Sequence, residues 1–325
     1  MFSTHEEECT MRMKFFAVFT LLAAVLGLTF GGRAWAAEAD MQAFRGAYLQ
    51  DVNESKGFHL ELMFSGPTFQ SNVISDGQMW QDGSAVADGK LSWSYTNLAA
   101  EQTQQYEMPF YAERSGNVVV FYGKRGNVWQ KENILGGFSW LIDAVTSDDR
   151  DTKLKYAATV TDVQCEDAGN GQMRMQLTFD GKALSEVRDK AVRDRIATMS
   201  EADQKDALAT VHYLNAALAE SNLKCAWTVD AKTGKTAVVT ADLTDVMRNY
   251  AKAVLQDSYQ GKISLSQEET DLLASIGYYY TLQVYLVKND GSAKHAVIPA
   301  AVKNSAQEAN IFADVNSEVV SAIKK

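Results

Sequence analysis

The chain has 325 residues and a formal net charge of −10 at pH 7. This acidity argues against binding to nucleic acid or to a bare anionic membrane, because both attract clustered Lys and Arg side chains. The sequence has only three prolines and no tract rich in Ser, Pro and Gly, which argues against long linkers and mucin-like stalks.

The N-terminal part has the features of a secretory signal peptide over residues 1–36. Arg12 and Lys14 supply positive charge, Phe15–Phe30 is apolar, and Ala34–Ala36 has the small-x-small pattern of a cleavage site. A transmembrane helix is the alternative, but the apolar run is shorter than the roughly 18 to 20 residues that span a bilayer. We therefore expect export to the periplasm, cell envelope or extracellular space, and no membrane span once the signal is removed.

Two cysteines, Cys165 and Cys225, remain after cleavage at this site. In an oxidising compartment this pair predicts a disulfide, which would stabilise the fold by about 4 kcal/mol in the chain-entropy model. Two buried free thiols are the alternative, because free cysteine packs well as a small hydrophobic residue.

The first half of the mature chain predicts a helix and then an antiparallel meander. The helix covers Ala37–Asn53 and the meander Gly57–Lys131, where apolar and polar residues alternate between Gly, Asn and Asp turn residues. Ile134–Val145 is apolar on nearly every side, which predicts a buried helix. Gly136 and Gly137 weaken its start, so we expect them to be the hinge of a lid; a fixed core helix is the alternative.

The meander carries many large aromatic side chains. They are either the ordinary core and cross-strand pairs of a sheet, or one face of the sheet lines an apolar ligand cavity. The residues expected to line such a cavity are Leu60, Leu62, Phe64, Trp80, Trp93, Tyr95, Phe110, Phe121, Trp129, Phe138, Leu141 and Ile142.

The second half of the chain mixes strands and helices. We expect strands over Leu154–Cys165, Met173–Phe179, Leu223–Val229, Thr236–Leu243, Tyr278–Val287 and Lys294–Val302. We expect a helical region over Ala183–Glu220 that breaks near Met199-Ser200, a helix over Val246–Gln256, and a further helix opened by the capping box Ser266–Glu269.

The sequence shows no catalytic or metal-binding motif. The histidines that follow the signal, His59, His212 and His295, are scattered, with no HExxH pattern and no Cys/His cluster. A GxSxG nucleophile and the glycine loops that bind nucleotides are also missing from the sequence. We therefore expect no cofactor, no metal and no covalent chemistry. A hydrolase with dispersed carboxylates stays open, because its two acids need not be neighbours in sequence.

Three stretches, Phe64–Asp82, Gly89–Thr96 and Asn117–Lys131, combine basic or polar residues, Gly and aromatics, and the last ends in Val-Trp-Gln-Lys. They resemble strand pairs of the periplasmic lipoprotein-carrier superfamily, which includes mycobacterial glycolipid-binding lipoproteins. The resemblance covers residues 37–245 and implies an α+β fold, in which an antiparallel incomplete (half) β-barrel wraps around helices and holds acyl chains on its apolar side. This chain lacks the lipidated cysteine. It also carries residues 246–325, which we expect to form a C-terminal α+β extension on the same sheet or a small subdomain.

These features together predict an exported envelope protein that binds a hydrophobic or lipid-bearing ligand without covalent chemistry, with an envelope protein as a further partner. The first alternative is an extracytoplasmic interaction, sensor or structural module without a ligand cavity. The second is the carboxylate-dependent hydrolase.

Overall fold

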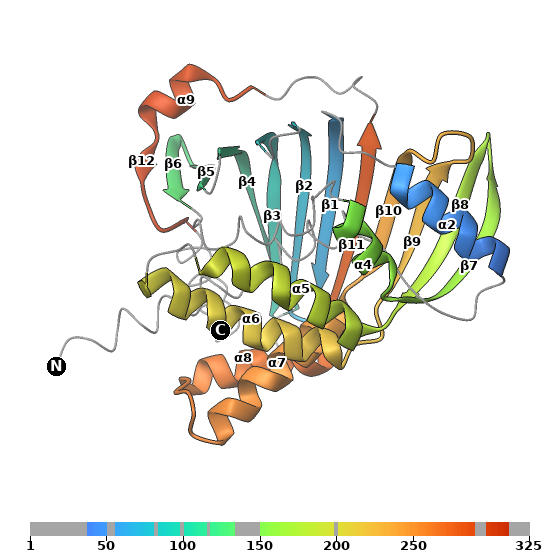
Figure 1. The fold of residues 1–325 in the computed structure, drawn as a ribbon. Coiled ribbons are helices and arrows are strands. Elements are labelled where there is room, and N and C mark those ends of the chain that lie inside the picture. The colour runs from blue at the N-terminus through green and yellow to red at the C-terminus, as the bar shows by residue number, and fades with distance from the viewer. Residues whose placement is uncertain are drawn as a thin grey trace.

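The structure, a computed structural model, describes residues 38–50, 56–80, 84–97, 101–115, 118–133, 150–197, 201–289 and 297–311. Its centre is a twelve-stranded sheet (Figure 1). The strands are β1 (Lys56–Ser65), β2 (Phe69–Met79), β3 (Ala85–Asn97), β4 (Gln102–Ser115), β5 (Val118–Arg125), β6 (Val128–Asn133), β7 (Val160–Gly169), β8 (Gln172–Phe179), β9 (Lys224–Asp230), β10 (Thr236–Asp242), β11 (Thr281–Asn289) and β12 (Gln307–Glu308). Their order across the sheet is β12-β6-β5-β4-β3-β2-β1-β11-β10-β9-β8-β7.

Most described helices lie on one face of this sheet, which we call the helix-side face. They are α2 (Glu38–Gln50), α4 (Arg150–Ala157), α5 (Gly181–Ile196), α6 (Glu201–Ala219), α7 (Thr244–Tyr259) and α8 (Gln267–Tyr279). The helices pack in succession, α2 on α4, α4 on α5, and so on to α8, and their most extensive contacts with the sheet are between α2 and β7 and between α7 and β11. The short helix α9 (Ala300–Ser305) packs on the opposite, outer face near β5 and β6 (Figure 1).

The fold class predicted from the sequence is confirmed. All strand pairs are antiparallel except β12 with β6, which is parallel. The edge strands β7 and β12 do not pair with each other, so the sheet stays open. The protein is therefore an α+β fold built on an incomplete barrel.

Helix α2 shows how helix and sheet share one core. Met41, Phe44, Ala47 and Tyr48 are buried, and their spacing of three to four residues places them on one side of the helix. The rings of Phe44 and Tyr48 meet the indole of Trp227 on β9 edge-on, with centroids 5.7 and 6.1 Å apart. This contact ties the first described helix to a strand that follows it by about 180 residues.

Strand β11 joins the C-terminal region to the centre of the sheet. It pairs with β1 on one side, where Leu62 faces Val284, and with β10 on the other, where Ala241 faces the same Val284. The sheet therefore links residues on both sides of position 245 through one continuous set of backbone hydrogen bonds.

Two predicted strands are wrong in part, Leu154–Cys165 before Val160 and Lys294–Val302 over its described residues. Residues 150–157 form α4, and β7 begins only at Val160, because Lys153, Tyr156 and Ala157 are buried at helical spacing. Residues 300–305 form α9 in place of the end of a strand, directly after Pro299. Proline favours the start of a helix, because its fixed φ suits the first turn and no backbone N–H is lost there.

The capping box at the start of α8 is confirmed. The hydroxyl of Ser266 accepts a hydrogen bond from the backbone N–H of Glu269, and the Glu269 carboxylate accepts one from the Ser266 N–H at 2.8 Å. Together the two bonds satisfy donors that a helix N-terminus otherwise leaves without partners.

The predicted disulfide between Cys165 and Cys225 is wrong, and both thiols are free. Cys165 lies on β7 opposite Met175, and Cys225 lies on β9 opposite Leu177, so strand β8 separates them. Two strand spacings place their Cα atoms roughly 10 Å or more apart. A disulfide requires Cα atoms within about 7 Å.

The predicted signal over residues 1–36 and the predicted lid, with Gly136 and Gly137, lie outside the described residues. Within the part that the structure describes, no helix is both long enough and apolar enough to cross a membrane.

Candidate functional site

Strands β1 to β5 present a continuous apolar surface to the helix-side face. Strand register aligns Leu62 with Val73, Val73 with Leu91, and Leu91 with Met108. These four side chains are between 1 and 9 % exposed. Since side chains of a strand alternate between faces, the residues two positions along each strand continue the same surface.

Aromatic rings form a connected group on this surface. Phe69 lies 5.7 Å from Phe64 and 5.3 Å from Tyr95, measured between ring centroids. Tyr106 stacks on Trp93 at 5.6 Å and meets Tyr95 edge-on at 5.8 Å. The contacts run from β1 to β4, so one connected set of rings joins four strands on the helix-side face.

The structure sorts the residues predicted to line a cavity. Leu60, Leu62, Phe64, Trp93, Tyr95, Phe110 and Phe121 belong to the core on the helix-side face. Trp80 is half-buried just after the end of β2. Phe138, Leu141 and Ile142 lie outside the described residues.

Trp129 is misplaced in the prediction, because it lies on the outer face. Its ring packs 5.4 Å from that of Tyr111, and both belong to a small outer core with Tyr122 and Val302. Trp129 pairs across strands with Lys124. Lys124 lies three positions after Phe121, which belongs to the helix-side core, so the side chains of Lys124 and Trp129 point to the opposite face. Alternation along a strand separates two faces but does not say which face meets the helices.

Sequence reasoning missed Phe69 and Met108, which are 2 % and 1 % exposed on the helix-side face. Met108 lies two positions before Phe110 on β4, so alternation from that residue would have found it. Phe69 begins β2 directly after the turn at Gly66, where no alternating pattern has yet started.

The indole of Trp93 carries a buried polar atom on this apolar face. Its side chain is 6 % exposed, and its Nε1–H has no hydrogen-bond acceptor in the described structure. Buried tryptophan normally finds a partner for this donor, because leaving it without one costs free energy. The N–H of Trp93 is therefore a donor that a polar atom of a ligand can use.

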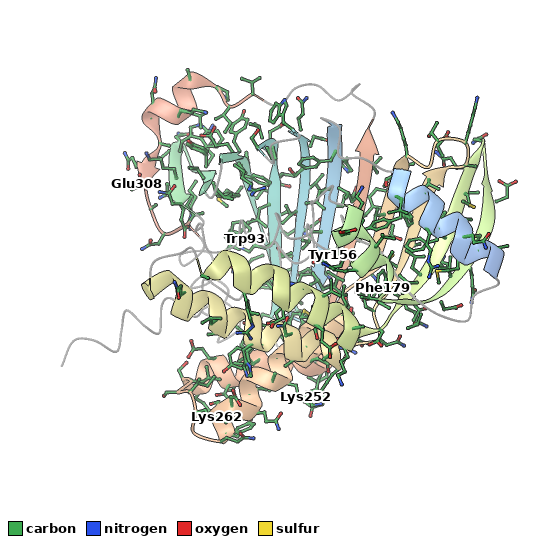
Figure 2. All side chains as sticks on the ribbon, viewed as in Figure 1. Trp93, Tyr156, Phe179, Lys252, Lys262 and Glu308 are labelled. Carbon is green, nitrogen blue, oxygen red and sulfur yellow. The ribbon has the colours of Figure 1, made fainter. Side chains whose placement is uncertain are left out.

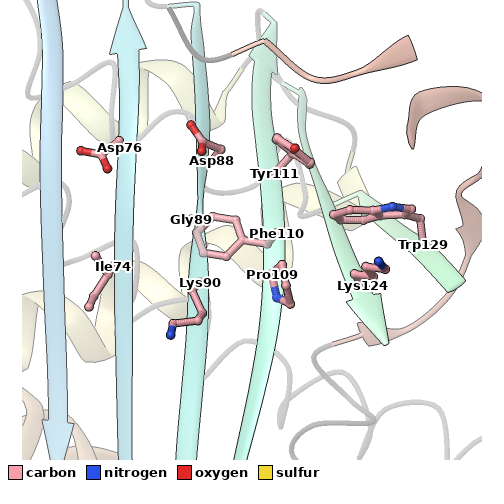
Figure 3. A pocket seen from close by; sticks show the side chains of 10 residues that line it. All are labelled: Ile74, Asp76, Asp88, Gly89, Lys90, Pro109, Phe110, Tyr111, Lys124 and Trp129. Atoms are coloured by element: carbon pink, nitrogen blue, oxygen red, sulfur yellow. The ribbon is translucent and has the colours of Figure 1, made fainter. Parts of the chain in front are cut away.

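The outer face carries a hollow of about 450 Å³ over β2 to β6 (Figure 3). Two carboxylates lie at one end and the rings of Tyr111 and Trp129 at the other, where the ammonium of Lys124 sits 6.0 Å from the Trp129 centroid. The lining residues are Ile74, Asp76, Asp88, Gly89, Lys90, Pro109, Phe110, Tyr111, Lys124 and Trp129.

The carboxylates belong to a row of side chains that crosses the outer face. His59, Asp76, Asp88 and Tyr111 lie opposite one another on successive strands. His59 contacts Asp76 at 2.9 Å and Glu61 at 3.1 Å. Although burial alone would lower the pKa of His59, these hydrogen bonds raise it. Burial and the charge of Asp76 raise the pKa of Asp88.

We assign no catalytic role to this hollow. Asp76 and Asp88 are both exposed, whereas the general acid of a carboxylate-pair hydrolase typically lies in an apolar pocket. His212, another residue considered above, is an exposed side chain on α6 that lies 3.8 Å from Asp257. Over the described ranges, no three His, Cys, Asp or Glu side chains gather as metal ligands would.

Comparisons with known proteins add little to this geometry. No protein-family profile and no curated protein matches the chain. Among solved structures, the chain is similar to LprF from Mycobacterium bovis, with 11% sequence identity and a TM-score of 0.37, over 82% of this chain and 98% of that one. At this level LprF supplies no argument about fold or function, and both rest on the geometry above.

Proposed function

We propose that this is an exported cell-envelope protein that binds a hydrophobic or lipid-bearing ligand on the helix-side face of its sheet, without covalent chemistry. The observation that carries the proposal is the apolar surface of β1 to β5. It combines a connected group of aromatic rings with a buried donor, Trp93 Nε1, that has no acceptor among the described residues.

The chemistry of this face fits an acyl chain. Each buried methylene contributes about 0.8 kcal/mol to binding, so a chain of several carbons binds without any charged contact. The most extensive contacts between the described helices and the sheet are at β7 and β11, while the aromatic group lies on β1 to β4. A ligand on that group would therefore lie away from the two strands on which α2 and α7 pack most extensively.

Lipid extraction and native mass spectrometry of protein purified from its own envelope test the proposal directly. We expect co-purified lipid, and displacement of an apolar dye by fatty acids. Protein that repeatedly carries no lipid and shows no dye displacement would contradict the proposal.

Two tryptophans on opposite faces locate the ligand. We expect 9,10-dibromostearate to quench tryptophan fluorescence, and Trp93→Phe to remove part of that quenching. Trp129→Phe is the matched control, because Trp129 lies on the outer face of the same half-sheet and should leave the ligand-dependent quenching intact. The opposite result, with quenching lost only in Trp129→Phe, would move the ligand to the outer hollow.

The outer hollow supports the second candidate, an extracytoplasmic interaction module. Its exposed carboxylates and aromatic rings suit a polar partner better than an acyl chain. Under this alternative the helix-side face is plain core, and both lipid experiments would be negative.

A further inference from the structure

The buried side of α5 contains a charged residue. Gly181, Leu184, Ser185 and Arg188 are all buried, at the spacing of one helix face. The Leu184 side chain belongs to the main core, and Arg188 is 4 % exposed. A guanidinium is almost never fully buried unless it is paired, so the surroundings of Arg188 require an explanation.

The described structure does not provide that pairing. Arg188 Nε and Nη2 are buried and have no hydrogen-bond partner. The adjacent carboxylate of Asp189 acts on Arg188 through its charge, while its oxygens accept hydrogen bonds from other side chains, one from Arg193 Nε at 2.6 Å and the other from Asn215 Nδ2 at 2.7 Å. Burial lowers the pKa of Arg188 to about 10, so the side chain is still protonated at neutral pH.

Arg188 lies beside the helix-side face. Its charge acts on Tyr156 of α4, which is 2 % exposed and belongs to the same core as Trp93 and Phe110. Figure 2 shows Tyr156 on the helix side of the sheet, next to α5. A second cation, Lys153, is buried on α4 with its ammonium 5.8 Å from the Tyr48 ring. The region where α4 meets α5 is therefore apolar and positively charged.

We infer that Arg188 binds the oxyanion head group, carboxylate or phosphate, of an amphiphilic ligand whose apolar part lies on the helix-side face. This inference rests on the proposed function and specifies its ligand class. A planar guanidinium matches a carboxylate or phosphate through two parallel N–H···O bonds. The bound anion would satisfy the two donors and neutralise the buried charge.

The test compares three probes on delipidated mature protein: laurate, methyl laurate and acetate. Laurate has both chain and charge, methyl laurate keeps the chain without the charge, and acetate keeps the charge without the chain. We expect laurate to bind about tenfold to a hundredfold more tightly than methyl laurate, as one charge-assisted contact predicts. The preference should persist in high salt, because a buried pair is screened little.

Arg188→Met should abolish the preference for laurate and leave the affinity for methyl laurate unchanged. Lys182→Met is the matched control, because it removes an exposed positive charge from the same helix with the same replacement. Without ligand, Arg188→Met should melt at the same temperature as the wild type or higher, since it removes a buried charge that has no partner. If Arg188→Met does not fold, the wild-type preference and its reduction in Arg188→Lys decide the question.

The outcomes separate the inference from the proposed function. Equal binding of laurate and methyl laurate by the wild type, or a preference that survives in Arg188→Met, would overturn the head-group role and keep the lipid function. Acetate that binds as tightly as laurate would mark a site for a free anion and overturn the lipid function. Binding of none of the three probes would overturn both.

Discussion

Gly181, the first residue of α5, lies where this helix meets the C-terminal end of α6, and its replacement by alanine tests that packing. A Cβ built there would overlap the backbone carbonyl oxygen of Leu218 and lie 2.8 Å from that of Ser221. Backbone oxygens cannot rotate away as the end of a flexible side chain can. The new methyl group must therefore push α5 and α6 apart.

The expected loss follows from two opposing contributions. Overpacking a close contact costs about 1–3 kcal/mol, and we expect the upper part of this range because both clashing atoms are backbone. The better helix propensity of alanine stabilises the folded state by at most about 1 kcal/mol, and by less than that at the first position of a helix. We therefore expect Gly181→Ala to lower the free energy of unfolding by about 2 kcal/mol.

Gly277 in α8 provides a matched control. A Cβ built there meets no atom within 4 Å, so only helix propensity acts. Gly277→Ala should raise the free energy of unfolding by about 0.5–1 kcal/mol. Urea denaturation followed by circular dichroism measures both variants. If Gly181→Ala is as stable as Gly277→Ala, the two helices do not pack as described.

Two further predictions concern charge and cysteine chemistry. The pKa of Asp88 is raised in the folded protein above its ordinary value of 3.8. Asp88 therefore contributes to the stability of the fold at pH values below 3.8, and this contribution is lost as the pH rises through the folded-state pKa. Asp88→Asn should therefore add a few tenths of a kcal/mol near pH 7, since exposed charges are screened. No gain is expected near pH 3, and an equal gain there would point to packing as the cause. A reductant should leave the melting temperature unchanged, because Cys165 and Cys225 are free. A drop of many degrees would show that the two cysteines form a disulfide after all.

Local patterns in the sequence determined many of the helices and strands of this protein. Alternation in the Gly57–Lys131 meander and the capping box at Ser266 depend on residues within a few positions of each other, and the strands and helix appear where expected. The helix predicted from Ala37 is present as α2 for the same reason. Period and capping are properties of neighbouring residues, so they can be read from the chain alone.

Tertiary structure decided how these helices and strands are arranged. The face that Trp129 occupies depends on strand register. The order of strands in the sheet places β8 between Cys165 and Cys225. The central place of β11 between β1 and β10 brings together segments more than 200 residues apart. Among the described residues, Arg188 Nε and Nη2 have no hydrogen-bond acceptor, because the adjacent carboxylate of Asp189 accepts from Arg193 and Asn215 instead. These features arise from long-range packing and pairing, and no short stretch of sequence contains them.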